Sequence, residues 1–233
     1  MNYVLDVEQT VSDKAAFARL FDHTLLKADA TPAQVEALCR EAAAYGFASV
    51  CVNSSYAALV SKLLAGTGVA TCCVVGFPLG AMSASAKALE TEEAVANGAG
   101  EIDMVIHLGM LKYGWPEAVR EDIAAVVGAA GPAIVKVIIE TCYLNEEEKI
   151  SACRLAQEAG AHYVKTSTGF GSGGATVEDI ALMRRCVGDT MGVKASGGIR
   201  DLDTAIAMLR AGASRIGASA TVAIMEQYME RMG

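Results

Sequence analysis

Residues 161–168 read AHYVKTST, and residues 169–174 continue as GFGSGG. The first segment predicts a β-strand that carries Lys165, and the second predicts a glycine-rich loop. A lysine is almost never fully buried unless it is paired or functional. In α/β proteins the chemistry lies where strands end and loops begin. Lys165 is therefore the first candidate catalytic residue, as an amine that forms a Schiff base with a carbonyl.

Apolar segments of strand length recur along the chain and alternate with alanine-rich amphipathic segments. Helix-capping signals begin several of these segments, and helix-ending glycines precede strands at intervals that fit two strand–helix units of about 30 residues. We therefore expect an α/β fold, a (β/α)8 TIM barrel that forms a single domain over residues 1–233, with residues 1–19 as an N-terminal helical extension. The expected strands are 20–24, 48–53, 69–76, 101–107, 133–140, 162–167, 192–196 and 214–217.

A doubly wound open sheet is the alternative fold. It usually has fewer strands and a G-x-G-x-x-G fingerprint after the first one. No such fingerprint follows the first expected strand. The barrel is preferred for these reasons.

The composition limits the classes of function. The 233 residues are 53% hydrophobic and only 20% charged, which suits one large core and a surface partly covered in a homo-oligomer, a dimer or tetramer. The net charge of −8 argues against nucleic-acid or anionic-membrane partners. Residues 63–86 carry no charge but contain glycines and Pro78, so they predict a buried strand and loop rather than a membrane span.

The seven cysteines do not suggest a disulfide framework or a zinc finger. No pair has C-x-x-C spacing, and the chain has three histidines. No basic segment followed by an apolar one marks a signal peptide at the N-terminus. We expect reduced thiols, no metal site and a cytoplasmic location.

Polar residues inside the expected strands are informative because barrel strands are covered on both faces. In EIDMVIH (101–107), period-2 alternation puts the isoleucines and the methionine on the helix-facing side and directs Asp103 and His107 into the barrel. A buried aspartate costs several kcal/mol unless it is paired or hydrogen-bonded. Asp103 therefore needs a cation.

Three expected strands supply lysines, and the six other lysines fall in helices or loops where we expect them to be solvated. One inward lysine that balances one aspartate would be structural. A network of three lysines and three carboxylates is more elaborate than packing requires and favours catalysis. Its members are Lys136, Lys165, Lys194, Asp22, Asp103 and Glu140.

The lysine cluster favours chemistry on a carbonyl. A second ammonium ~4 Å away costs about 4 kcal/mol at an effective dielectric of ~20, which brings a lysine pKa from ~10.4 to ~7–8. In that range an amine can attack a carbonyl, with a neighbouring carboxylate as proton carrier. These considerations leave open whether Lys165 or Lys194 is the nucleophile.

Glycines after the last strands indicate a phosphate group on the substrate. Gly197 and Gly198 follow the seventh expected strand, and GAS (217–219) follows the eighth, just before the helix expected at 220–232. Loops after strands seven and eight, with a helix N-terminus, commonly bind phosphate in these barrels. Gly169 adds a backbone donor near them.

The sequence resembles the deoxyribose-phosphate aldolases, a family of class I aldolases with a (β/α)8 barrel that use neither metal nor organic cofactor. The resemblance covers almost the whole chain. The matching segments are DHTLL (22–26), CVN (51–53), VGFPLG (75–80), EIDMVI (101–106), KVIIET (136–141), VKTSTGF (164–170) and VKASGGIR (193–200).

The resemblance implies roles for particular residues and a phosphosugar substrate, cleaved reversibly to D-glyceraldehyde 3-phosphate and acetaldehyde. Lys165 matches the Schiff-base lysine, Lys194 the lysine that lowers the nucleophile's pKa, and Asp103 the carboxylate of the proton relay. Lys136 is expected beside Asp103 as a supporting member of the relay. The expected substrate or phosphate contacts are Asp22, Thr24, Cys51, Gly169, Gly197, Gly198 and Ser219.

The chain departs from the family pattern at four places. His107 stands where asparagine is common, and Ala28 and Ser54 stand where proline is common. Phe170 replaces a phosphate-contacting lysine of some members, so phosphate binding here is expected to depend on backbone donors.

Three other functions compete with this one. They are a Schiff-base aldolase or transaldolase for a different sugar phosphate, a pyridoxal-phosphate enzyme, and a phosphosugar-binding module without turnover. Product analysis distinguishes another aldolase or transaldolase from a deoxyribose-phosphate aldolase. Visible absorption would reveal a pyridoxal-phosphate enzyme, and a turnover assay would identify a binding module.

Overall fold

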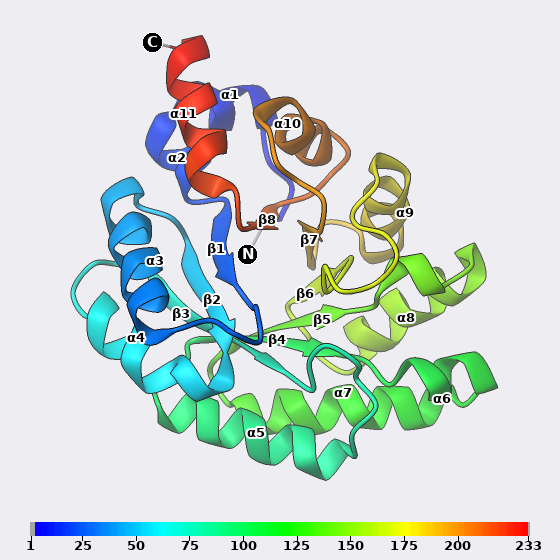
Figure 1. Ribbon diagram of the computed structural model, residues 1–233. Helices are drawn as coiled ribbons and strands as arrows, with labels where there is room; N and C mark the ends of the chain where they lie inside the picture. Colours follow the sequence, from blue (N-terminus) through cyan, green and yellow to red (C-terminus); the bar gives the residue numbers. More distant parts are fainter. Residues whose placement is uncertain (1–2, 233) are drawn as a thin grey trace.

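The structure, a computed structural model that describes residues 3–232, contains eight parallel strands closed into a barrel in chain order (Figure 1). Pairing of β1 with β8 closes the sheet. The predicted TIM-barrel fold is confirmed. The strands are β1 (Phe21–Leu25), β2 (Ser49–Asn53), β3 (Ala70–Val75), β4 (Glu101–Val105), β5 (Ile134–Ile138), β6 (Tyr163–Lys165), β7 (Gly192–Ser196) and β8 (Arg215–Ala218).

Helices surround the barrel and begin at the expected capping residues (Figure 1). Thr31 and Asn145 each form a capping box, with Gln34 and Glu148 respectively. The surrounding helices are α3 (Pro32–Tyr45), α4 (Ala57–Leu64), α5 (Ala84–Ala96), α6 (Leu108–Tyr113), α7 (Pro116–Ala130), α8 (Glu146–Glu158), α9 (Val177–Val187), α10 (Leu202–Arg210) and α11 (Thr221–Met232), with short 3-10 turns η1 (Ser54–Tyr56) and η2 (Thr141–Tyr143).

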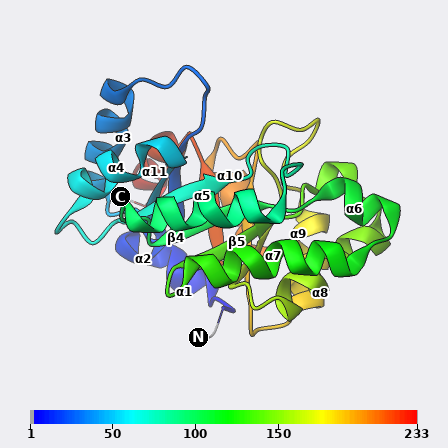
Figure 2. The ribbon, with the colours of Figure 1, turned by 90° about the horizontal axis from the view of Figure 1, so that it is seen from below.

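The two ends of the barrel differ. Two short helices, α1 (Val7–Ser12) and α2 (Lys14–Ala18), lie at the amino-terminal end of the strands, and the loops after β1 and β6 lie at the opposite end (Figure 2). Residues 1–2 of the expected N-terminal extension fall outside the described residues. Among the helices within residues 3–232, none combines the length and the apolar character that spanning a bilayer requires.

Strand alternation separates two layers of side chains. Ile102 and Met104 belong to the large core between the sheet and the helices, as expected from the period of β4. Asp103, between them in sequence, is fully buried on the other face. A small apolar cluster lies on this inner face as well, and its members are Leu26, Cys51, Cys72 and Val74.

The inward orientation expected for His107 is wrong. Strand β4 ends at Val105, and His107 is instead the N-cap of α6, where its Nδ1 accepts a hydrogen bond from the Met110 amide at 3.3 Å. Side-chain alternation holds only while the chain stays in the strand ladder. The two residues added to the predicted strand therefore misplaced this side chain.

The expectation that all six other lysines are solvated is wrong for Lys87. This side chain is fully buried between α5 and α7, and its Nζ donates to the Val105 carbonyl at 2.8 Å and to Asp122 Oδ2 at 2.6 Å. Burial lowers the pKa of Lys87, and burial raises the pKa of Asp122. Desolvation therefore outweighs the attraction within this pair, as is common for buried ion pairs.

We predict that Lys87→Met lowers the free energy of unfolding by about 3–5 kcal/mol, because it leaves the Asp122 carboxylate buried without its cation. The double variant Lys87→Met/Asp122→Leu should recover most of that loss, since it removes both charges. Urea unfolding of both variants measures the effect, with the exposed Lys62→Met as control. A double variant as unstable as the single one would contradict the prediction.

Candidate active site

A cavity of about 320 Å³ opens at the carboxyl ends of β1, β6, β7 and β8. Ligand sites of (β/α)8 barrels lie at this end. Most of the expected substrate-contacting residues line the cavity together with Lys165. They are Thr24, Gly169, Gly197, Gly198 and Ser219.

Lys165 ends strand β6, and only 3% of the residue is exposed. Its Nζ lies 2.7 Å from Asp103 Oδ2. Among residues 3–232, Asp103 is the one carboxylate recorded within 4.0 Å of this ammonium group. The side chain therefore joins the cavity to the charged interior of the barrel.

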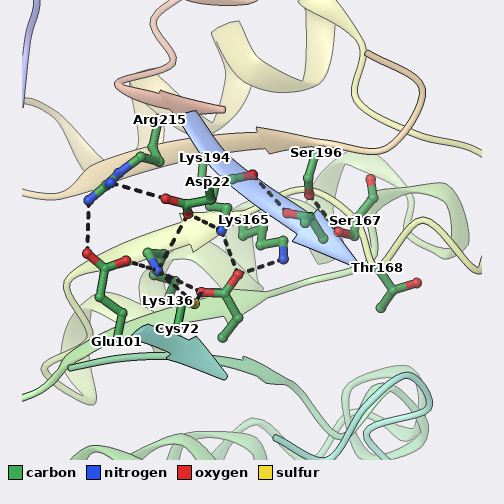
Figure 3. Close-up of polar contacts among 12 residues, drawn as sticks. Asp22, Cys72, Glu101, Lys136, Lys165, Ser167, Thr168, Lys194, Ser196 and Arg215 are labelled. Carbon is green, nitrogen blue, oxygen red and sulfur yellow. Dashed lines mark hydrogen bonds and ion pairs between the residues drawn. The ribbon is translucent and has the colours of Figure 1, made fainter. Parts of the chain in front are cut away.

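Asp103 is the centre of the charged cluster, and its three lysine partners, Lys136, Lys165 and Lys194, are labelled in Figure 3. Its Oδ2 lies 2.7 Å from the Nζ atoms of both Lys165 and Lys194, and its Oδ1 lies 2.8 Å from Lys136 Nζ. The Cys72 thiol donates to Oδ1 at 3.3 Å. Burial acts to raise the pKa of Asp103, but the three ammonium groups outweigh it and hold that pKa well below its usual range. Asp103 is therefore an ionised carboxylate.

Lys194 and Lys136 have further carboxylate partners besides Asp103. Lys194 also pairs with Asp22, and Lys136 Nζ lies 2.5 Å from Glu101 Oε2 and 3.7 Å from Asp22 Oδ2. Burial acts to lower the pKa of each lysine, but the carboxylates raise the pKa of Lys194 and hold that of Lys136 well above its usual value. Both lysines therefore remain protonated.

Two members of the network were missed in the sequence. Glu101 lies on the same face of β4 as Asp103, and Arg215 in β8 bridges Asp22 Oδ1 at 3.1 Å and Glu101 Oε1 at 3.2 Å. The period-2 rule that directs Asp103 inward directs Glu101 inward as well. Arg215 had no comparable signal, because it stands at the very start of its strand.

Glu140 does not join the lysines, contrary to expectation. It lies beyond the end of β5, where it accepts hydrogen bonds from the backbone amide of Thr168, at 3.1 Å, and from the Thr168 hydroxyl. It therefore holds the loop that follows Lys165. As at His107, the expected strand continued past the end of the real one, and the alternation no longer applied.

Asp22 and Cys51 lie deeper than expected. Both are fully buried, and neither is among the residues that line the cavity. Asp22 accepts from the Ser49 hydroxyl at 2.7 Å and pairs with Lys194 beneath the cavity floor. Thr24, two residues on in β1, does line the cavity. The structure thus places Asp22 in the charged cluster, and Cys51 in the inner apolar cluster.

Four glycines are among the residues that line the cavity. Gly169, Gly197 and Gly198 have positive φ angles of 83°, 84° and 80°, which favour glycine. Gly217 has a different role, because a Cβ there would lie 2.9 Å from Lys194 Cε. The missing side chain leaves room for Lys194 to reach Asp103.

The sequence and the fold match those of known proteins. A family model described as DeoC/LacD family aldolase matches residues 16–227. The chain belongs to this family. It is therefore an aldolase, a carbon–carbon lyase.

Relatives in this family are similar over most of their length. A deoxyribose-phosphate aldolase of Geobacillus sp. (strain WCH70) is 60% identical over 210 residues, which cover 90% of this chain and 94% of that protein. One from Brevibacillus brevis is 59% identical over 207 residues, covering 89% and 94%. The tetrameric deoxyribose phosphate aldolase of Aeropyrum pernix superimposes with a TM-score of 0.88 at 35% identity, covering 97% of this chain and 98% of that one.

We predict that Gly217→Ala lowers kcat of the aldolase at least tenfold, a change of about 1.4 kcal/mol in the barrier. The new methyl group displaces the Lys194 side chain and moves its ammonium group away from Asp103. Steady-state kinetics measures the effect. Gly100→Ala is the matched control, because a Cβ at Gly100 meets nothing within 4 Å. Equal activity of the two variants would contradict the prediction.

Proposed function

We propose that this aldolase cleaves 2-deoxy-D-ribose 5-phosphate reversibly to D-glyceraldehyde 3-phosphate and acetaldehyde, through a Schiff base at Lys165. The names of relatives at about 60% identity support the choice of substrate. The observation that carries the mechanism is the position of Lys165, a lysine that lines the cavity and contacts the buried carboxylate Asp103.

The surroundings of the lysines favour Lys165 over Lys194 as the nucleophile. Lys194 is fully buried, does not line the cavity, and is held as an ammonium group between Asp22 and Asp103. Lys165 is the lysine of the cluster that a substrate in the cavity can reach. We therefore assign the nucleophilic amine to Lys165.

The proposed reaction begins when this amine adds to the C1 aldehyde of the open-chain sugar, and loss of water gives an iminium. The C2–C3 bond then breaks, its electron pair moves toward the iminium nitrogen, and the 3-hydroxyl proton passes to Asp103. D-Glyceraldehyde 3-phosphate leaves, and a neutral enamine remains on Lys165. Asp103 returns the proton to C2, and water hydrolyses the resulting iminium to acetaldehyde and the free amine.

The charge cluster makes Asp103 suitable for this transfer. In the resting cluster it is a weak base because three cations surround it. When the iminium becomes an enamine, the positive charge on the Lys165 nitrogen disappears next to Asp103 Oδ2. Loss of a neighbouring cation raises the pKa of a carboxylate. Asp103 therefore becomes more basic as the proton arrives and less basic again once C2 is protonated.

The part of the cavity lined by Gly169, Gly197, Gly198 and Ser219 is proposed to hold the phosphate. The helix α11 begins there, at Thr221, and a helix N-terminus favours an anion. Phe170 also lines the cavity, so backbone amides are proposed as the main donors.

We also infer that the chain forms a homo-oligomer, because its relative from Aeropyrum pernix is tetrameric. Exposed apolar surface supports this inference. Tyr113 and Trp115 are 70% and 53% exposed and pack edge to face, with their ring centroids 4.5 Å apart. Light scattering coupled to size-exclusion chromatography tests it.

The proposed function predicts that borohydride with deoxyribose 5-phosphate leaves a reduced two-carbon adduct on Lys165, because the enamine and its iminium are the last covalent species. Lys165→Ala should lose both the adduct and turnover. Peptide mapping by mass spectrometry locates the adduct, and product analysis identifies acetaldehyde. Lys62→Ala, which removes an exposed lysine, is the control and should behave like the wild type.

Two results would overturn this proposal. One is an adduct on Lys194 instead of Lys165. The other is substantial turnover of deoxyribose 5-phosphate by Lys165→Ala. Turnover of deoxyribose 5-phosphate to a product other than a two-carbon aldehyde, together with an adduct on Lys165, would refute the proposed cleavage and retain the Schiff base.

A further inference from the structure

Three potential metal ligands meet inside the barrel. Cys51, Cys72 and Asp103 come from the consecutive strands β2, β3 and β4, and their Sγ and carboxylate oxygen atoms all lie within 4.8 Å of one another. Cys51 and Cys72 are paired directly in the sheet register. All three residues are fully buried. The barrel thus brings together two thiols and a carboxylate that are far apart in the sequence.

The spacing of these atoms suits a small divalent cation. Zinc binds thiolate at about 2.3 Å and carboxylate at about 2.0–2.2 Å, in tetrahedral geometry. Two ligand atoms on one edge of such a tetrahedron are then roughly 3.5 Å apart. Cys72 Sγ and Asp103 Oδ1 are 3.3 Å apart, joined by the thiol proton. A cation can take the place of that proton with small side-chain movements.

The charges of the cluster permit the exchange. If a cation takes Asp103, Lys136 keeps Glu101 at 2.5 Å and Lys194 keeps Asp22. Only Lys165 loses its recorded carboxylate partner. A divalent cation that replaces the two thiol protons also leaves the total charge unchanged. Lys136 Nζ lies 2.8 Å from Asp103 Oδ1 and donates to Cys72 Sγ at 3.4 Å. The electrostatic cost therefore falls on the ammonium groups of Lys165, which loses its carboxylate, and of Lys136, which lies beside the cation.

We propose that Cys51, Cys72 and Asp103 form a binding site for a thiophilic divalent cation such as Zn²⁺, and that occupancy stops turnover by removing Asp103 from the lysine cluster. The inhibition rests on the proposed role of Asp103, whereas the binding does not. The spacing of the cysteines in the sequence gave no indication of this site, because its ligands come from three strands.

The position of the site relative to the substrate cavity also supports the proposal. Leu26 lines the substrate cavity and also packs in the cluster that contains Cys51 and Cys72, with the half-buried Phe77 against it. The proposed site therefore adjoins the cavity on its Leu26 side.

Titration of the full chain with Co²⁺ tests the binding. Thiolate coordination gives a charge-transfer absorption, which should saturate at one Co²⁺ per chain, weaken in Cys51→Ser, disappear in Cys51→Ser/Cys72→Ser, and be displaced by Zn²⁺. Cys73→Ser is the matched control, because Cys73 follows Cys72 in β3 but faces the outer core. Circular dichroism establishes that the variants fold, and Cys51→Ala replaces any serine variant that does not.

The activity arm uses the same proteins. Zn²⁺ should inhibit the wild type and Cys73→Ser, a chelator should restore turnover, and Cys51→Ser should need at least about tenfold more Zn²⁺ for half inhibition. Absence of the Co²⁺ absorption from the wild type, or its persistence in the folded double variant, would overturn the site. Binding without inhibition would keep the site and refute its proposed effect on turnover.

Discussion

One buried carboxylate, Asp103, lies within 2.8 Å of three lysine ammonium groups in the middle of the barrel. Removal of the Asp103 charge leaves the buried Lys165 without its recorded carboxylate partner, which is costly in a protein interior. Asp22, Glu101 and Arg215 complete the balance around them. The same attraction that keeps the cluster intact fixes Lys165 at the cavity wall, so stability and the proposed chemistry depend on one set of contacts.

The strand register makes this cluster possible. Asp103 pairs with Lys136 across β4 and β5, and Lys165 pairs with Lys194 across β6 and β7. A slip of one residue in any of these strands would turn the charged side chain toward the helices. Gly217 also makes the cluster possible, because a side chain at this position would occupy the space that the Lys194 side chain fills. The charged cluster therefore depends on the register of these strands and on Gly217, as well as on the barrel fold itself.

Much of this arrangement could be predicted from the sequence, and the errors have common physical causes. Alternation correctly directed Asp103 inward but failed at His107 and Glu140, because both lie past the point where their strands end. Lys87 was misjudged because helical sequence does not reveal a buried acidic partner on another helix. The approach of Cys72 to Asp103 depends on the register between β3 and β4, which local pattern does not determine.

In the proposed mechanism Asp103 moves the proton while Lys165 holds the substrate covalently. Exchange of the acetaldehyde methyl protons with deuterated water, measured by NMR for the wild type and Asp103→Asn, separates these two roles. Exchange should fall by about 10²–10⁴-fold in the variant, while borohydride still traps acetaldehyde on Lys165. Exchange within twofold of the wild type would contradict it.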